Sequence, residues 1–185
     1  MRSIIVTEFI SLDGVIDSPG GGTHARAGWT FTEVPFVAEA YEIKGREQTE
    51  AGAMLMGRVS YVDFAPVWPT MAEFAEYNAM PKYVVSTTLV EEPEWNNTSI
   101  IRSLDDVAAL RQGDGGPIIV HGSATLAQGL AAADLVDRYH LLVFPLLLGS
   151  GKRLFADAES SGRLALVEHE AYSNGVIKAV YDVVR

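Results

Sequence analysis

Blocks of apolar residues separated by polar and glycine-rich stretches run the length of the chain and predict alternating strands and helices. Residues 3–10 (SIIVTEFI) are rich in Ile, Val and Phe, which favours a first strand, and Glu8 is its polar exception. A glutamate in such a strand most often faces solvent or an edge, and a place in a functional site is the alternative. Further strands are predicted at 53–56, 82–86, 99–102, 117–121 and 138–144.

Two helix starts are marked by capping residues. Thr32 is expected to cap a helix that begins at Glu33 and ends near Gly45. Ser103, with Asp106 three residues later, resembles the start of a second helix. These helices lie between predicted strands, as the alternation of an α/β protein requires.

The C-terminal part of the chain predicts a hairpin. Strand-like runs at 164–172 and 176–184 are joined through Asn174-Gly175, a strong signal for a tight turn. The whole pattern predicts one three-layer α/β/α domain over residues 1–185, with a mixed, mostly parallel sheet that ends in an antiparallel hairpin. The long connection at 11–32 is expected to be a lid or binding loop. A surface excursion is the alternative.

Composition narrows the possible functions. The 185 residues carry a net charge of −10, from 14 basic and 24 acidic side chains, which repels nucleic acid and anionic lipid. The chain has no cysteine, which excludes disulfides and thiolate sites and fits a reducing cytoplasm. No apolar stretch reaches the roughly 18 residues that a membrane span needs, and the N-terminus is interpreted as a strand rather than a signal peptide. A bound anion would need a local positive feature.

Two strand-to-helix junctions supply such a feature. Gly57-Arg58 follows one strand and Gly122-Ser123 follows another, with helices predicted from there to Phe64 and to about Ala133. The unpaired N–H groups of a helix start attract anions, and glycine lets a phosphate approach the backbone closely. Parallel strands would place both junctions at one edge of the sheet, where ligands of such folds bind. Tight turns without a ligand are the alternative.

Arg58 sharpens this prediction. A guanidinium at a helix start can hold a phosphate through paired hydrogen bonds, and an exposed surface arginine is the alternative. Ser86, Thr87 and Thr88 would add hydroxyl donors at the end of a third strand. One cation with several hydroxyls suits a terminal phosphate such as the adenosine 2′-phosphate of NADPH.

Other nucleotide-binding and catalytic motifs are absent from the sequence. Gly149-Ser150-Gly151-Lys152 lacks the spacing of a phosphate loop, and no Gly-x-Gly-x-x-Gly follows a strand. No Gly-x-Ser-x-Gly elbow is present, so serine hydrolysis has no support. No metal is expected, because no metal-ligand spacing joins the four histidines, which are His24, His121, His140 and His169.

Several motifs resemble those of the dihydrofolate-reductase-like superfamily. They are SLDGVI at 11–16, MGRVSY at 56–61 and IVHGSATL at 119–126. The stretch 129–155, which contains PLLLGSG at 145–151, is similar to the reductase domain of bacterial riboflavin-biosynthesis deaminase–reductases and their stand-alone relatives. The resemblance covers essentially the whole chain.

This resemblance implies a cytoplasmic, homodimeric oxidoreductase that holds NADPH across the carboxyl edge of its sheet. It implies hydride transfer to a C=N or C=O bond of a pterin-, pyrimidine- or ribityl-type substrate, as in 5-amino-6-(5-phosphoribosylamino)uracil reductase or dihydrofolate reductase. The residues expected at the cofactor are Thr7, Gly14, Val15, Ile16, Gly57, Arg58, Ser86, Thr87, Thr88, Gly122, Ser123, Ala124, Thr125, Leu126, Gly149 and Gly151.

The substrate side of the expected site is less defined. Dihydrofolate reductase binds its pterin through a carboxylate on the first helix, and none of Glu33, Glu39 and Glu42 stands in an unmistakable matching position. Folate reduction is therefore not favoured. The aromatic residues expected to wall a flat substrate are Trp29, Tyr61, Phe64 and Trp68.

Asp13 is the leading candidate for a catalytic polar group near the reacting ring. Its alternative role is to fix its loop through turn hydrogen bonds. For the protein as a whole, the alternative to a reductase is a non-catalytic nucleotide-binding or regulatory module that keeps the cofactor site. A dimeric scaffold without a ligand is a third reading.

Overall fold

The computed structural model describes residues 1–90, 94–155 and 161–185, which form one eight-stranded sheet. The strand order is β4-β3-β2-β5-β1-β6-β8-β7. The six strands from β4 to β6 are mutually parallel, whereas β8 and β7 run antiparallel to their neighbours. The strands are β1 (Ile4–Ser11), β2 (Ala53–Gly57), β3 (Lys82–Val85), β4 (Thr98–Ile101), β5 (Ile118–His121), β6 (Arg138–Phe144), β7 (Arg163–Ala171) and β8 (Ile177–Val184).

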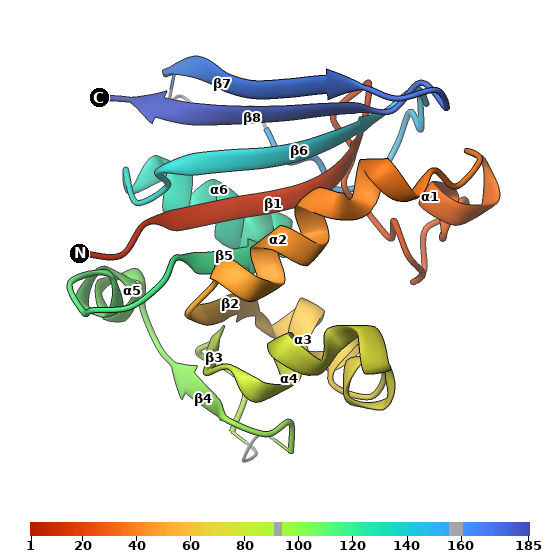
Figure 1. Ribbon diagram of the computed structural model, residues 1–185. Helices are drawn as coiled ribbons and strands as arrows, with labels where there is room; N and C mark the ends of the chain where they lie inside the picture. The colour runs from red at the N-terminus through yellow and green to blue at the C-terminus, as the bar shows by residue number, and fades with distance from the viewer. Residues whose placement is uncertain (91–93, 156–160) are drawn as a thin grey trace.

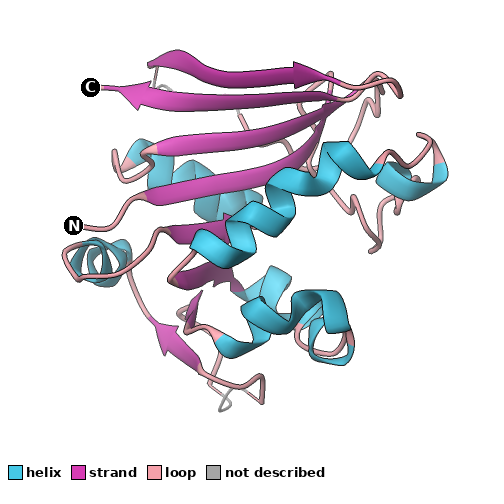
Figure 2. Ribbon diagram, viewed as in Figure 1, coloured by secondary structure: helices cyan, strands magenta, loops and turns pink. Residues whose placement is uncertain are grey.

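Helices cover both faces of this sheet (Figure 1). The α2, α3 and α4 helices lie on one face and α5 and α6 on the other, as Figure 2 also shows. The predicted three-layer, mostly parallel fold with a C-terminal hairpin is confirmed. The helices are α1 (Trp29–Thr32), α2 (Glu42–Glu50), α3 (Arg58–Phe64), α4 (Ala75–Ala79), α5 (Leu104–Arg111) and α6 (Ala124–Ala132), with 3₁₀ turns η1 (Ala38–Tyr41), η2 (Trp68–Thr70) and η3 (Ala72–Phe74).

The two faces of β1 belong to different parts of the core. Ile4 and Val6 pack in the cluster that contains Leu130 of α6, whereas Ile5 packs in the cluster that contains Tyr77 of α4. Successive side chains of a strand point to opposite faces, so β1 supports both helical layers. A polar residue on β1 is therefore placed inside one layer or the other.

The prediction for the first long helix is wrong. Thr32 ends the short α1 instead of capping a new helix, and the main helix of this region is α2, which contains Gly45 within it. Pro35 explains the shift, because proline lacks an N–H donor and disfavours helical backbone in the residue before it. The α2 helix is fixed by what it buries, namely Ile43 and Glu47.

Local turn chemistry predicted other elements correctly. Ser103 and Asp106 form a reciprocal capping box at the start of α5. The β7–β8 hairpin turns through Gly175, whose φ of 83° suits glycine. Both signals depend on a few neighbouring residues, which the sequence displays directly.

Candidate functional site

The carboxyl ends of three strands form one row at an edge of the sheet. Gly57, Val85 and Ile101 are register partners across β2, β3 and β4. The residues that follow them, Arg58, Ser86 and Arg102, therefore leave the sheet at the same edge. The expected cationic group and the expected hydroxyl turn are thus neighbours in the fold.

β1 and β5 separate at this same edge of the sheet. Their last register pair is Thr7 with His121. From Glu8 to Ser11, β1 pairs with β6 and, within the described residues, with no strand on its other side. The turn into α6 begins with Gly122, where the two strands separate. A split of this kind leaves strand backbone open to a ligand at the carboxyl edge.

The N-terminus of α6 lies beside the start of α3. Ser123 precedes α6 with a φ of 65° and makes no side-chain cap to it. Its hydroxyl instead accepts the N–H of Gly57 at 2.8 Å and donates to Ser60 Oγ at 2.8 Å. Ser123 therefore occupies the Gly57 N–H, and contact of Gly57 with a cofactor stays a prediction.

The first-turn N–H groups of α6 have no intrahelical acceptor, as in any helix. They belong to Ala124, Thr125 and Leu126, which are among the residues expected at the cofactor. Gly122 has a φ of 57°, and a Cβ there would lie 3.1 Å from Ser60 Oγ. The α6 start can accept an anion, and contact with a cofactor stays a prediction.

The row at the ends of β2, β3 and β4 contains one arginine that the sequence analysis did not single out. Nη1 of Arg102 donates to the carbonyls of Ser86 and Leu89, at 2.8 Å each. The Ser86 hydroxyl accepts the N–H of Leu89 at 2.9 Å and that of Thr88 at 3.2 Å. Arg102 thus holds the hydroxyl turn in shape, and exposed Arg58 lies in the same row.

Asp13 fixes its loop. Its carboxylate accepts the Ser11 hydroxyl at 2.6 Å and the N–H groups of Leu148 and Gly149 at 3.1 and 2.7 Å. The Ser11 hydrogen bond, with help from these amides, lowers the pKa of Asp13 to about 2. An ionised, fully engaged carboxylate is a poor proton donor at neutral pH. The contacts favour the loop-fixing role over the catalytic one.

The loops around Asp13 and Gly149 form one packed unit. Gly14 accepts a backbone hydrogen bond from Leu154, and Ile16 donates one to Lys152. Val15 is fully buried, and a Cβ on Gly151 would lie 2.8 Å from its Cγ1 atom. Glycine at 151 is thus explained by close packing. Cofactor contacts of these loop residues stay a prediction.

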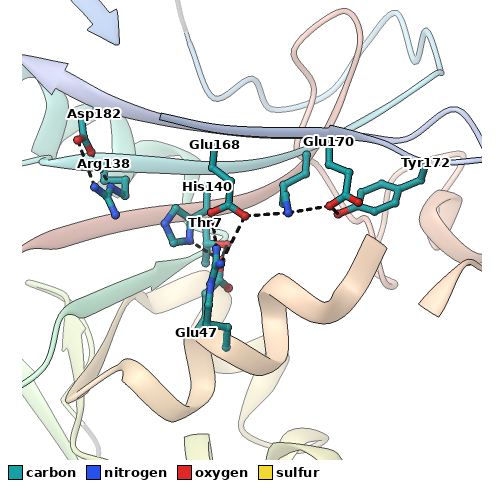
Figure 3. Close-up of polar contacts among 10 residues, drawn as sticks. Thr7, Glu47, Arg138, His140, Glu168, Glu170, Tyr172 and Asp182 are labelled. Carbon is teal, nitrogen blue, oxygen red and sulfur yellow. Dashed lines mark hydrogen bonds and ion pairs between the residues drawn. The ribbon is translucent and has the colours of Figure 1, made fainter. Parts of the chain in front are cut away.

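A buried polar cluster on the α2 face was missed by the sequence analysis. Glu47 of α2 accepts the Thr7 hydroxyl at 2.7 Å and lies 2.8 Å from Nδ1 of His140 (Figure 3). Lys44 contacts both Thr7 and Glu47, the latter at 3.4 Å, and its Nζ lies 5.0 Å from the centroid of the Phe9 ring. The sequence signal for Glu47 is a glutamate four residues after Ile43, on the buried side of a helix.

Its neighbours keep Glu47 ionised although it is buried. Burial by itself raises the pKa of Glu47, but Lys44 and the His140 hydrogen bond outweigh it, and the pKa falls to about 2. Because a carboxylate accepts hydrogen bonds and does not donate them, Nδ1 of His140 carries the proton. Glu47 is therefore an anion at neutral pH that holds Thr7, Lys44 and His140 in place.

The aromatic residues expected to wall the substrate divide into two groups. Trp29 is fully buried, packs edge-on against Phe144 and donates its Nε1–H to Asp17, so the expectation that it contacts substrate is corrected. Tyr61 is buried too, and its hydroxyl accepts an N–H from Glu94. Trp29 is apolar and large enough to be core, which sequence alone could not distinguish.

Phe64 and Trp68 form a stack with ring centroids 4.3 Å apart, on the same face as α2. Trp68 meets the His121 ring edge-on, and His121 shares a 2.7 Å hydrogen bond with the Tyr77 hydroxyl. Burial lowers the pKa of His121 to about 3, so the ring is neutral. This aromatic group lies beside the split between β1 and β5, because His121 pairs with Thr7 there.

A depression of about 540 Å³ lies on the α2 face but at the other end of the sheet. Ser3, Pro117 and Arg138, at the amino ends of β1, β5 and β6, line it. Its guanidinium groups are already paired, Arg46 with Glu168 and Arg138 with Asp182 (Figure 3). The depression therefore lies away from the edge at which the dinucleotide is expected.

Known proteins resemble this chain in sequence. The uncharacterized protein YyaP of Bacillus subtilis (strain 168) is 34% identical over 103 residues, which are 54% of this chain. The match spans about half of the length of that relative, 53%.

No helix among the described residues is long and apolar enough to cross a membrane.

Solved structures resemble it over the whole fold. A riboflavin biosynthesis protein from Shewanella sp. PV-4 superposes with a TM-score of 0.80 at 24% identity, with both chains fully covered. A pyrimidine reductase-like protein from Corynebacterium diphtheriae gives 0.67 at 14% identity, covering 100% of this chain and 92% of the other. Dihydrofolate reductase from Enterococcus faecalis, in complex with NADP(H), gives 0.67 at 11% identity, covering 99% and 97%.

These likenesses confirm the dihydrofolate-reductase-like fold. The sequence model of the RibD C-terminal domain matches residues 2–178, which is nearly the whole chain. That match supports a reductase-type, oxidoreductase function. The chain belongs to the RibD C-terminal domain family.

Proposed function

We propose that the protein is an NADPH-dependent reductase that transfers a hydride to a C=N or C=O bond of a small heteroaromatic substrate of the pterin, pyrimidine or ribityl type. One observation carries the proposal. The start of α6, the open edge of β1 and the Arg58–Ser86–Arg102 row all lie at the carboxyl edge of one parallel sheet. The dihydrofolate reductase of similar fold was solved with NADP(H), which supports the same class of cofactor here.

The residues present fit an extended dinucleotide. Arg58, Thr87 and Thr88 would hold the 2′-phosphate, and the first turn of α6 would hold the pyrophosphate. The protein as a whole is acidic, with a net charge of −10, so these local donors are what allow an anion to bind. The nicotinamide ring would lie at the split between β1 and β5.

The substrate would lie on the α2 face beside this split. The cofactor supplies the hydride when it is bound. Phe64 and Trp68 offer flat apolar surface, and Lys44 offers an N–H donor held in place by Thr7 and Glu47. We propose Lys44 as the group that holds a proton near the reacting bond, since Asp13 is ionised and engaged.

Replacing Arg58 with Ala tests the cofactor half of the proposal. The variant should lose about 1.5–3 kcal/mol of NADPH binding, which is about ten- to a hundredfold in Kd, while NADH binding changes little. The reason is that only NADPH carries the 2′-phosphate. Titration followed by the fluorescence of the reduced nicotinamide gives both constants.

Arg163→Ala is the matched control, because Arg163 is an exposed arginine on β7, at the far edge of the sheet. Equal weakening of NADPH and NADH by Arg58→Ala would contradict the proposed 2′-phosphate site. Steady oxidation of NADPH with pterin, pyrimidine or ribityl compounds would support an enzyme. Tight binding with no turnover would support the alternative, a nucleotide-binding or regulatory module.

We also propose that the chain pairs with a second copy in the cytoplasm. Leu164, Leu166 and Val167 are exposed on β7, the outermost strand of the sheet. An exposed apolar edge strand is a common site of chain pairing. Light scattering of the purified protein would test the dimer.

A further inference from the structure

Glu8 of β1 has no place in the function proposed above. Its side chain is 3% exposed, and its Oε1 atom has no hydrogen-bond partner among the described residues. Burial raises the pKa of Glu8 well above its usual value, and Lys44 and the N–H of Gly122 offset this only in part. A buried carboxyl oxygen without a hydrogen-bond partner opposes folding, so the presence of Glu8 calls for an explanation.

The position of Glu8 supplies one. Glu8 is the first residue of β1 beyond the last pair with β5, and Gly122 is the first residue beyond the other member of that pair. The Gly122 backbone N–H lies close enough to the Glu8 carboxyl to lower its pKa. Glu8 shares one face of β1 with Ile4 and Val6, because every second residue of a strand points the same way. Ile4 and Val6 pack with α6, so this is the α6 face. The carboxyl group therefore lies at the split, at the base of α6.

The chemistry of a carboxyl restricts what it can meet there. A carboxyl oxygen repels phosphate, so the phosphates of a dinucleotide must lie further out, on the first turn of α6. A group that reaches Glu8 must donate a hydrogen bond to Oε1. A protonated carboxyl can also donate through its O–H. An acceptor and a donor side by side match a primary carboxamide, which offers an N–H and a carbonyl in the same arrangement.

We infer that Glu8 recognises the carboxamide of the nicotinamide ring, at the split between β1 and the turn into α6. This inference rests on the proposed function, because it needs a nicotinamide cofactor at the carboxyl edge. Glu8 then selects the amide form of the ring and fixes its orientation, while Arg58 and α6 hold the phosphates.

The test compares two ligands that differ at that group. Calorimetry gives the Kd of NADP⁺ and of nicotinic acid adenine dinucleotide phosphate, which carries a carboxylate in place of the carboxamide. Wild-type protein should favour the amide by about tenfold or more, because the acid lacks the N–H that Oε1 of Glu8 would accept and brings an oxygen against it instead. Glu8→Gln should reduce this preference by about tenfold, since a glutamine N–H can donate to the carboxylate.

Glu39→Gln is the control, because Glu39 is exposed on η1, and it should keep the wild-type preference. The comparison of the two ligands on wild-type protein stands even where Glu8→Gln does not fold. Equal affinity of wild-type protein for both ligands, or an unchanged preference in Glu8→Gln, would overturn this inference alone. Failure of both ligands to bind wild-type protein would refute the proposed function, and the inference with it.

Discussion

Two buried glutamates lie on opposite sides of β1 and have different surroundings. Glu8 belongs to β1 itself, whereas Glu47 belongs to α2. Each is 3% exposed. Glu47 reaches β1 from α2 and has Thr7, Lys44 and His140 as partners. Glu8 projects from β1 toward the start of α6, and its Oε1 atom lacks a partner in the described part of the chain. Burial alone therefore does not tell a structural carboxylate from a candidate binding group.

What separates the two residues is hydrogen bonding. A paired buried charge organises its neighbours, and removing it leaves them uncompensated. An unpaired buried carboxyl lowers stability, as polar groups at functional sites commonly do. The two glutamates should accordingly respond in opposite ways to substitution and to pH.

The largest expected effect is the loss of stability in Glu47→Ala. Removing this carboxylate leaves Lys44 and His140 without their buried anion, and we expect a cost of about 3–5 kcal/mol in the free energy of unfolding. Urea denaturation measures it. Glu50→Ala, at an exposed position three residues further along α2, should stay within about 0.5 kcal/mol of wild type. A Glu47→Ala variant as stable as Glu50→Ala would show that the cluster is not structural.

A smaller effect is the pH dependence of stability, which should have opposite signs for the two residues. The folded pKa of Glu47, about 2, is lower than its ordinary value of 4.5, so its contribution is present above about pH 4.5 and is lost as pH falls toward 2. The folded pKa of Glu8 is raised, so wild-type protein should lose stability as pH rises above 4.5 toward that pKa.

Substitution by glutamine isolates each contribution. The stability difference between wild type and Glu47→Gln should shrink on acidification, whereas that between Glu8→Gln and wild type should grow as pH rises. Thermal or urea unfolding across the pH range measures both differences. Parallel pH profiles for the two variants would contradict the contrast between the hydrogen-bonded carboxylate of Glu47 and the Glu8 carboxyl, whose Oε1 has no partner among the described residues.

Local signals in the sequence predicted the C-terminal hairpin, the start of α5 and the ends of two strands. The Asn174-Gly175 turn, the Ser103 cap and the glycines at the ends of β2 and β5 each depend on neighbours close along the chain. Since the strands are parallel, those glycines had to reach the same edge. The two strand–glycine–helix junctions of the site, at Gly57 and Gly122, were therefore predictable from the sequence.

The interior of the site was not predictable, because it depends on contacts between distant residues. Glu47 meets His140 across 93 positions of sequence, and no spacing rule links them. Glu47 also lies beyond Gly45, where the sequence predicted the first long helix to end, although α2 continues to Glu50. A large aromatic residue such as Trp29 can line a ligand cleft or pack in the core. Only the packing around it, which the sequence does not display, shows that it is a core residue.

A crystal structure of the protein grown with NADPH would show most directly whether a nicotinamide dinucleotide lies along the carboxyl edge of the sheet. We expect the 2′-phosphate at Arg58, the pyrophosphate at the first turn of α6 and the ring carboxamide against Glu8. A dinucleotide bound instead in the depression between Arg46 and Arg138, at the opposite end of the sheet, would contradict it.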